Sequence, residues 1–312
     1  MIFTDGLTKR FGTNTAVDRL TLQVNEGEVF GFLGPNGAGK TTTVRMLACL
    51  LGPSSGEARV AGLRVGVDDP AIRASVGILT ETPGLYDRLT AAKNLEIFAR
   101  LYGVDNPAQS VEKYLRLLGL WERAGDAAGT FSKGMRQKLA LARALLHEPK
   151  VIFLDEPTSG LDPESAKIVR DFIESLRGQG RTIFLTTHNL DEADRLCDRV
   201  AIFKQHLLEL DTPEALRHKL YGDQVHVRLR APAPAYAASV RALPFVRKVE
   251  VTADGFLVES TDPDANNPAI VRALVTAGAD VQYVEKVAHS LEEAYLRLVN
   301  GAPAQAPDAA RR

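Results

Sequence analysis

The sequence is poor in cysteine and contains no long uncharged apolar run. Only two cysteines occur among its 312 residues, Cys49 and Cys197, and both lie in apolar helical patterns. They exclude a disulfide framework, and we interpret them as small core residues of a protein from a reducing compartment. Charged residues such as Arg45 and Glu57 interrupt every stretch that approaches the ~18 apolar residues of a membrane-spanning helix. Because MIFTDGLTKR at the N-terminus also lacks the apolar core of a signal peptide, we expect a cytosolic chain that does not itself cross a membrane.

An excess of one charge sign is missing as well. The 38 lysines and arginines nearly match the 39 aspartates and glutamates, which leaves a net charge of −1. Proteins that bind nucleic acids or anionic membranes usually carry a basic excess, so we expect no nucleic-acid partner. With 45% hydrophobic and 25% charged residues the composition is that of a globular protein. A chain of this length is expected to form two domains, or one large and one small.

Strand-like and helical segments alternate over residues 1–220, which predicts an α/β sheet domain. The apolar runs that we interpret as buried strands lie at 29–33, 151–154 and 182–185. A helical pattern over 40–51, ended by Gly52-Pro53, follows the first of these strands. Residues 83–148 show helical periodicity and almost no strand pattern. We therefore expect a helical subdomain inserted into the sheet domain.

The pattern changes after residue 220. The order strand, helix, strand, strand, helix, strand over 221–300 predicts a small α+β domain of the split βαβ, ferredoxin-like kind. Within it, Asn267-Pro268 forms an N-cap and first-turn pair, so we expect the second helix to begin there. The tail GAPAQAPDAARR, residues 301–312, is expected to be disordered.

Three glycines and a proline separate the first buried strand from its helix in the sequence GPNGAGKT. This matches the pattern G-x-x-x-x-G-K-[ST] in its required context, after a strand and at the start of a helix. Glycines let backbone N–H groups face a phosphate chain, and the helix N-terminus adds partial positive charge there. The Lys40 ammonium can then bind the β- and γ-phosphates, and the Thr41 hydroxyl can hold Mg²⁺. The residues expected to surround the phosphates are Gly34, Pro35, Asn36, Gly37, Ala38, Gly39, Lys40, Thr41 and Thr42.

A second buried strand ends in two acids, Asp155 and Glu156, in the sequence VIFLDE. Asp155 at the strand end suits a Mg²⁺ ligand, directly or through water. Glu156 is one residue further, where a carboxylate can orient a water molecule and take its proton. The alternative is an acidic cap for the next segment, and the phosphate loop upstream makes it the weaker interpretation.

The sequence FSKGM at 131–135 precedes another helix. Ser132 suits an N-cap, and capping alone would explain it. Gly134 in the first turn costs about 1 kcal/mol relative to alanine. That cost predicts a close approach to this part of the backbone, for which a second phosphate is the candidate.

Together these segments resemble the ATP-binding-cassette (ABC) ATPases in their order and spacing. GPNGAGKT, FSKGM, VIFLDE, SGLD at 159–162 and His188 in TTHNLDEAD carry the resemblance, which covers residues 1–220. Each segment after the first is a weak signal alone, whereas the ordered set is specific. The resemblance implies a P-loop nucleotide hydrolase that binds ATP and Mg²⁺. Within this family, the chain is similar to the separate ATPase subunits of exporters for antibiotics, lipids or polysaccharides.

The resemblance also implies a homodimer, because this chain carries both halves of a composite site. In the family each ATP lies between the phosphate loop of one chain and the signature segment (here 131–135) of the other, head to tail. Carried over, Ser132 and Gly134 contact a γ-phosphate bound by the partner chain, and His188 hydrogen-bonds a γ-phosphate. Asp162 precedes Pro163 and is also an N-cap candidate, so it can serve both the cap and the dimer contact.

Three further positions follow from the resemblance. Phe11 stands where the family stacks an aromatic ring on adenine, with core packing as the alternative. Glu81 replaces a glutamine of the family; a carboxylate can still coordinate Mg²⁺, but it cannot donate a hydrogen bond to water. Lys133 replaces the first glycine of the signature segment. We interpret it as a solvated first-turn residue, and a phosphate contact in the partner is the alternative.

The predicted function is that of the ATP-binding and ATP-hydrolysing subunit of an exporter. It would act at the cytoplasmic face of the cell membrane through a separate permease, contacted by residues 82–90, from Thr82 to Thr90. One alternative is a soluble ABC ATPase that acts on nucleic acid or the ribosome, although such proteins usually carry coiled coils, zinc sites or two cassettes. Another is a ligand-controlled switch that uses residues 221–300, which the sequence leaves open.

Overall fold

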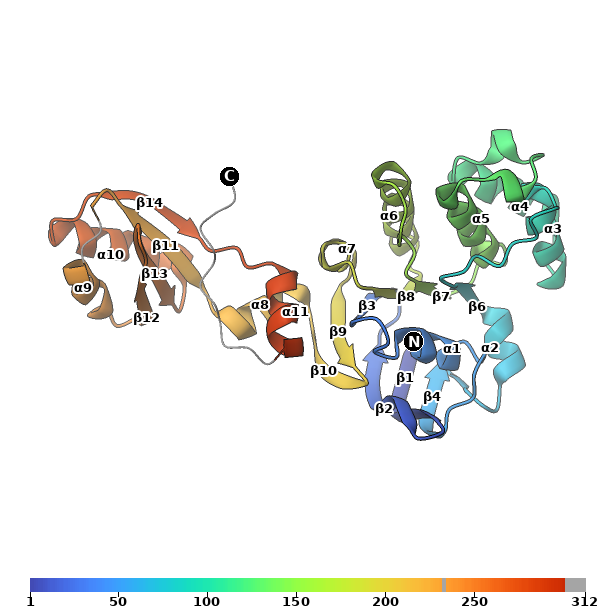
Figure 1. The fold of residues 1–312 in the computed structure, drawn as a ribbon, viewed down its shortest axis with the longest axis horizontal. Coiled ribbons are helices and arrows are strands. Elements are labelled where there is room, and N and C mark those ends of the chain that lie inside the picture. The colour runs from blue at the N-terminus through green and yellow to red at the C-terminus, as the bar shows by residue number, and fades with distance from the viewer. Residues whose placement is uncertain (232–233, 301–312) are drawn as a thin grey trace. The chain divides into compact units, whose positions relative to one another are not determined.

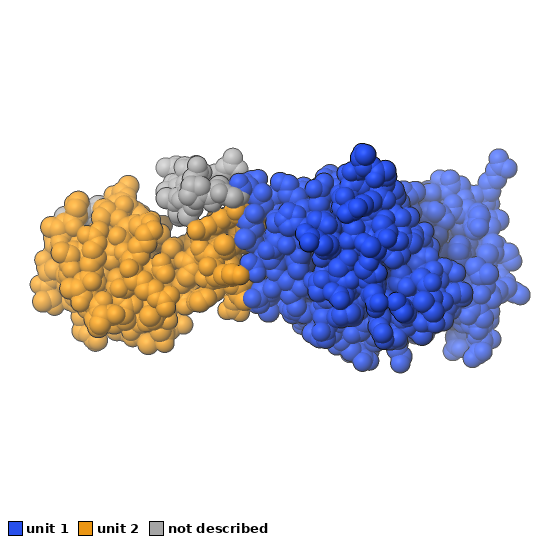
Figure 2. Space-filling view, turned by 90° about the horizontal axis from the view of Figure 1, so that it is seen from below, with its two compact units in different colours: residues 1–213, 298–312 blue, residues 214–297 orange. Residues whose placement is uncertain are grey.

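The computed structural model describes residues 1–231 and 234–300, which form two compact units (Figure 1 and Figure 2). The first unit comprises Met1–Pro213 with the described residues from Leu298 onward, and the second comprises Glu214–Arg297. The division precedes residue 220 because helix α8 (Pro213–Tyr221) belongs mostly to the second unit, where Arg297 donates a hydrogen bond to the Leu220 carbonyl. The predicted tail, 301–312, lies outside the described residues.

Two sheets form the first unit. The antiparallel sheet has the order β2-β1-β4-β5, with β1 at Ile2–Phe11, β2 at Asn14–Val24, β4 at Ser55–Val60 and β5 at Leu63–Arg64. The larger sheet has the order β10-β9-β3-β8-β7-β6, with β3 at Val29–Leu33, β6 at Val76–Leu79, β7 at Val151–Asp155, β8 at Thr182–Thr187, β9 at Arg199–Lys204 and β10 at His206–Asp211. All of its pairs are parallel except that of β9 with β10. Parallel strands are covered on both faces, which is why β3 and β7 are almost uninterrupted apolar runs and β8 is buried throughout.

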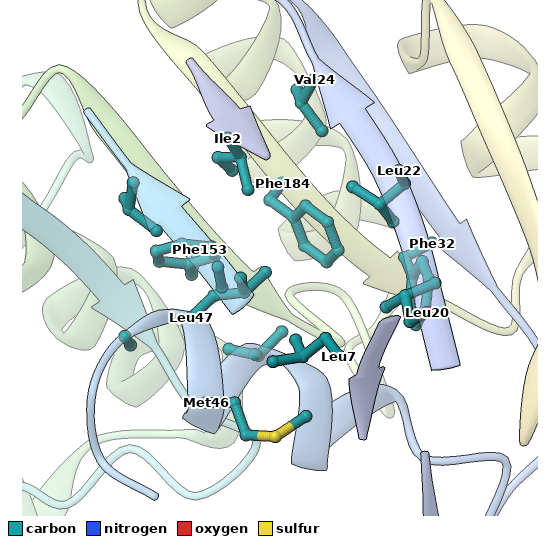
Figure 3. Packing of buried hydrophobic residues seen from close by; sticks show 14 of the residues in the cluster. Ile2, Leu7, Leu20, Leu22, Val24, Phe32, Met46, Leu47, Phe153 and Phe184 are labelled. Atoms are coloured by element: carbon teal, nitrogen blue, oxygen red, sulfur yellow. The ribbon is translucent and has the colours of Figure 1, made fainter. Parts of the chain in front are cut away.

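The main core lies between these two sheets and helix α1 (Lys40–Leu47). Figure 3 shows Phe32 and Phe184 of the larger sheet near Leu7 and Leu20 of the antiparallel sheet, with Met46 of α1 at the same core. The rings of Phe32 and Phe184 are 5.3 Å apart between centroids. Burial of each such side chain stabilises the fold by about 1.5–3 kcal/mol. This packing fixes the helix that begins directly after the phosphate loop.

Helix α1 ends earlier than the sequence pattern predicts. It stops at Leu47 instead of residue 51, with Ala48 as its C-cap. Cys49 then takes a left-handed backbone conformation, with φ at 55°, which a helix cannot continue through. Both Cys49 and Cys197 are buried free thiols, in agreement with the expectation of small core residues.

Three helices between β6 and β7 lie in the range 83–148, where the sequence predicts a helical subdomain (Figure 1). They are α3 at Ala91–Leu101, α4 at Pro107–Leu117 and α5 at Lys133–Leu145, with 3₁₀ turns at Trp121–Arg123 and Ala128–Thr130. The remaining helices of the first unit are α2 at Asp69–Ser75, α6 at Pro163–Arg177 and α7 at Leu190–Leu196. Ser132 caps α5 by accepting a hydrogen bond from the Met135 N–H at 3.3 Å, as expected of an N-cap serine.

The second unit has one antiparallel sheet in the order β12-β13-β11-β14. Its elements are β11 at Gln224–Leu229, a 3₁₀ turn at Pro234–Tyr236, α9 at Ala237–Arg241, β12 at Val246–Val251, β13 at Gly255–Ser260, α10 at Pro263–Thr276 and β14 at Val281–Lys286. Helix α11 at Leu291–Asn300 belongs to this unit as far as Arg297. The sheet and α10 enclose a core of their own, around Val227, Phe256 and Ile270. The assignment of this unit to a ferredoxin-like family stays a prediction.

The predicted start of α10 at Asn267-Pro268 is wrong. The helix begins at Pro263, and Pro268 lies inside it. Asp262 and Pro263 offer the same pair of cap and first-turn proline further upstream, and the Asp262 carboxylate accepts a hydrogen bond from the Ala265 N–H at 3.1 Å. The earlier pair therefore starts the helix.

Candidate active site

A cavity of about 410 Å³ lies at the carboxyl ends of the parallel strands, beside the start of α1. Its lining consists of Ala16, Pro35, Asn36, Gly37, Ala38, Gly39, Lys40, Thr41, Thr42, Glu81, Glu156, Ser159 and His188. The carboxyl ends of neighbouring parallel strands meet on one edge of a sheet, so loops far apart in sequence converge there. The predicted phosphate loop, Glu81, Glu156 and His188 are thereby brought together.

Close backbone contacts explain two glycines of the phosphate loop. At Gly39 the backbone has φ at 105°, and a Cβ there would collide with the Ala16 carbonyl oxygen. A Cβ at Gly34 would collide with the Phe203 carbonyl oxygen, although Gly34 itself does not line the cavity. Glycine is the residue that tolerates both demands. The loop is therefore held against β2 and β9 and cannot relax away from the helix that it starts.

Lys40 is buried at the bottom of the loop, with only 6% of its surface exposed. Its ammonium donates a hydrogen bond to the Gly34 carbonyl at 2.7 Å and lies 3.4 Å from a Glu156 carboxylate oxygen. A buried ammonium needs such partners, because an unpaired buried charge is costly. The contacts hold the cation where the loop's N–H groups and the α1 N-terminus also converge.

Glu156 connects Lys40 and His188. One carboxylate oxygen faces Lys40, and the other lies 2.7 Å from Nδ1 of His188. Its backbone has φ at 52°, a left-handed conformation that costs a non-glycine residue ~1–2 kcal/mol. The Glu156 N–H donates to the Thr186 carbonyl at 3.0 Å, which holds that conformation. A residue with a strained backbone, held by contacts to Lys40 and His188, is typical of a functional position.

Asp155 is buried beside the cavity. One of its carboxylate oxygens accepts a hydrogen bond from the Thr186 hydroxyl, while Oδ2 has no hydrogen-bond partner among the described residues. Thr41, whose hydroxyl is an oxygen donor, lines the cavity, whereas Asp155 is not one of the lining residues. Mg²⁺ typically takes one or two protein oxygens together with waters and substrate phosphates, so this pair of oxygens fits the ion. No group of three or more His, Cys, Asp or Glu side chains suited to a metal occurs in the part of the chain that the structure describes.

Glu81 and Phe11 differ in their relation to the cavity. Glu81 is exposed and lines it. Phe11 lies at the end of β1, is 49% exposed and is absent from the lining. The alternative of core packing for Phe11 is therefore wrong. The Lys9 ammonium lies 5.2 Å from the centroid of the Phe11 ring, so one face of that ring is occupied by a cation.

Ser132, Gly134 and Asp162 lie outside this cavity. Asp162 caps α6 by accepting a hydrogen bond from the Ser165 N–H at 2.9 Å, as the sequence predicts. The close approach that the sequence predicts at Gly134 is present, and it is made by Ser165, whose Oγ a Cβ at Gly134 would hit. The neighbour that requires this glycine therefore belongs to the same chain, and no phosphate is needed to explain it.

Sequence reasoning missed three residues that shape the site. Ser159 lines the cavity, and its place in the SGLD segment was the signal that could have identified it. Ala16 contributes from β2, and Thr186 holds both Asp155 and Glu156 from β8. No local pattern marks Ala16 or Thr186, because each acts through a strand neighbour that is distant in sequence.

Comparison with known proteins decides the family. A model described as ABC transporter matches residues 17–159. The chain is 38% identical to the daunorubicin resistance ATP-binding protein of Streptomyces coeruleorubidus, over 95% of both chains. It belongs to the ATP-binding subunits of ABC transporters. The family also includes the bacitracin transport ATP-binding protein of Bacillus licheniformis, which is 34% identical over 96% of this chain and 98% of that one.

Solved structures share the cassette fold. The ATP-binding subunit of an ABC transporter is 29% identical and gives a TM-score of 0.65, over 71% of this chain and 94% of that chain. A dimeric cassette bound to ADP and Pi is 24% identical and gives a TM-score of 0.63, over 68% and 98%. The predicted P-loop cassette, the ABC-type ATPase activity and the binding of ATP are thereby confirmed for this chain.

Proposed function

We propose that the chain powers export through a separate membrane permease and that it does so as a head-to-tail homodimer. The position of the signature segment carries this proposal. Ser132 and Asp162 lie outside the cavity that holds Lys40 and Glu156, so one copy cannot place them at its own phosphates. A second copy, turned head to tail, supplies them. Relatives whose names record daunorubicin resistance, bacitracin transport and Nod factor export support the direction of transport.

The residues of the cavity have distinct roles in ATP hydrolysis. Lys40 and the N–H groups of its loop bind the β- and γ-phosphates. Glu156 orients a water molecule and takes its proton as the water oxygen attacks the γ-phosphorus and the bond to ADP breaks. His188 hydrogen-bonds the γ-phosphate, and its contact with the Glu156 carboxylate keeps that base in position. Mg²⁺ neutralises phosphate charge when bound, and Thr41 and Asp155 would hold it, with Glu81 as a further oxygen donor.

The permease contact is assigned to residues 82–90. Most of this segment is exposed, including Tyr86 with 53% of its surface accessible. Asn94 holds the segment in shape from below, since its side-chain amide donates to the carbonyls of Tyr86, Leu89 and Thr90. An exposed but fixed surface suits transmission of a movement. None of the described helices is long and apolar enough to span a membrane, and the chain would reach the membrane through its permease.

The test is recovery of partners by a tagged Glu156→Gln chain from membranes of its own cells, with and without Mg-ATP. We expect the variant to bind ATP, to stay in the closed dimer and to lose about 10²–10⁴-fold in hydrolysis, because the amide cannot accept a proton. A multi-span membrane protein in stoichiometric amount should copurify, and a Lys40→Ala chain is the control for nucleotide dependence. Recovery of the homodimer alone would contradict export and favour a ligand-controlled switch. Wild-type turnover by Glu156→Gln would remove Glu156 from the role of base.

A further inference from the structure

A buried hydrogen bond joins helix α5, which begins within the signature segment, to the loop that follows Glu156. Gln137, in the second turn of α5, is 5% exposed, and its Nε2 donates to the Pro157 carbonyl at 3.0 Å. A carbonyl left without a partner at such a depth costs free energy, so this contact constrains both of the elements that it joins. It is the first of several contacts between the start of α5 and residues 157–165.

At its loop end, this bond lies next to the strained backbone of Glu156. Pro157 is the next residue along the chain, and Glu156 has the left-handed backbone described above. The turn is closed by the Ser159 N–H, which donates to the Glu156 carbonyl at 3.2 Å. A residue held in a strained conformation depends on its surroundings to stay there. The bond from Gln137 to Pro157 is one of these restraints.

At its helix end, the bond lies next to the signature segment. Gln137 lies one turn after Lys133 and Gly134, and these residues contact the same loop. The Lys133 ammonium lies over Gly160, where a Cβ would collide with it, and Gly134 packs against Ser165. The first turns of α5 and residues 157–165 are thus interlocked at three points. A shift of one must move the other.

We propose that Gln137 is a positioning residue that links the two ATP sites of the homodimer. This rests on the head-to-tail dimer proposed above. In each chain, Gln137 connects Glu156 with Ser132. Glu156 acts on the ATP bound by its own chain, whereas Ser132 contacts the ATP bound by the partner subunit. Loss of γ-phosphate at one site therefore shifts the signature segment at the other. The amide does not touch ATP, and it acts through Pro157 and α5.

The test uses mixed dimers with one complete site. A dimer of one wild-type chain and one Lys40→Ala chain is purified through two different tags. Its complete site combines Lys40 and Glu156 of the wild-type chain with the signature segment of the Lys40→Ala chain. Gln137→Leu is then placed in one chain or in the other. We expect about a tenfold loss of ATP hydrolysis from either placement, because each leaves a buried Pro157 carbonyl unpaired. In the wild-type chain the change frees the loop that holds the base, and in the Lys40→Ala chain it frees the signature segment. In the Gln137→Leu homodimer, the Hill coefficient for ATP should fall toward 1.

Matched variants separate this role from a loss of folding. Gln109→Leu makes the same change at an exposed position of α4 and should leave hydrolysis and the Hill coefficient unchanged. Gln137→Glu keeps the side-chain shape, removes the N–H donor and serves as the second variant if Gln137→Leu does not fold. Loss from one placement only, or a wild-type Hill coefficient in the variant homodimer, would overturn the link. A mixed pair that forms no dimer with Mg-ATP would instead overturn the homodimer and the link together. If the mixed dimer forms but does not hydrolyse ATP, the Hill coefficient of the Gln137→Leu homodimer decides the link.

Discussion

At the scale of single residues, the side chains of the proposed active site hold one another in place. Lys40 and His188 contact the two oxygens of Glu156, and Thr186 fixes both Asp155 and the Glu156 backbone. Each buried charge has a partner in the chain, which keeps it in place before nucleotide arrives. Preorganised charge of this kind is what phosphoryl transfer requires, because little covalent chemistry is left for the protein.

Replacement of Lys40 by alanine should abolish tight nucleotide binding. The variant loses charge-assisted hydrogen bonds worth about 1.5–3 kcal/mol each, and ATP affinity should therefore fall by about tenfold or more per bond. Titration calorimetry with ATP and Mg²⁺ measures the change. Lys93→Ala, at an exposed lysine of α3 that pairs with Glu96, is the control. Unchanged affinity in Lys40→Ala would contradict the assignment of the cavity.

At the scale of elements, helix α5 is held by contacts at both of its ends. Its N-terminus packs on the loop before α6, and the residues after its C-terminus reach β6, since the His147 Nε2–H donates to the Val76 carbonyl at 3.1 Å. The Tyr102 ring, next to the end of α3, stacks on His147 with centroids 3.9 Å apart. Both ends of this helix therefore depend on close contacts, and each end gives a test.

Replacement of Gly134 by alanine should destabilise the fold, because the added Cβ meets both Oγ and Cβ of Ser165. Overpacking of this kind costs about 1–3 kcal/mol. The double variant with Ser165→Gly should recover most of the loss, and urea unfolding measures both. Gly125→Ala is the matched control, since a Cβ there meets nothing within 4 Å. Equal midpoints for Gly134→Ala and Gly125→Ala would contradict the contact.

Protonation of His147 should weaken the first unit in mild acid. Burial lowers the pKa of His147, and its Nδ1 has no hydrogen-bond partner among the described residues. The unfolded chain therefore binds a proton at His147 more readily than the folded chain does. The free energy of unfolding is highest above about pH 6.5, the ordinary pKa of histidine, and it decreases as the pH falls below that value. The free energy of unfolding of the wild type should drop more between pH 7.5 and 5.5 than that of His147→Gln. Parallel curves for the two proteins would contradict a buried neutral imidazole.

At the scale of the whole molecule, each of the two units has a hydrophobic core of its own among the described residues. The core around Phe32 and Phe184 uses residues of the first unit alone, and the core around Phe256 and Ile270 uses residues of the second. A unit with its own core can unfold as a cooperative unit of its own. The cavity proposed to bind nucleotide is lined only by residues of the first unit.

Scanning calorimetry should therefore show two unfolding transitions, of which Mg-ATP raises only one. At a free ATP concentration of 100 times its dissociation constant, the stabilisation of the first unit should be about 2.7 kcal/mol. Lys40→Ala should show both transitions and no response to ATP. One transition that moves as a whole with ATP would contradict this independence.

Much of the active site follows from the sequence because its parts are local. A strand, a glycine-rich turn and a helix predict the phosphate loop around Lys40, and acids at the end of a strand predict Asp155 and Glu156. The helical subdomain follows in the same way from its periodicity. Errors arose where two local signals competed, as at Asp262-Pro263 and Asn267-Pro268, since the sequence does not show which cap forms its hydrogen bond.

Only the tertiary structure decided which distant residues hold these parts. The order β3-β8-β7 places Thr186 beside Asp155 and Glu156, and no pattern around Thr186 records that neighbour. Gly134 was recognised as a costly position, but the fold was needed to show that Ser165 approaches it. The sequence by itself determined the chemistry of the site, because phosphate binding depends on short segments with fixed backbone shapes. The fold decided the contacts between segments, because these depend on strand order and helix packing over the whole unit.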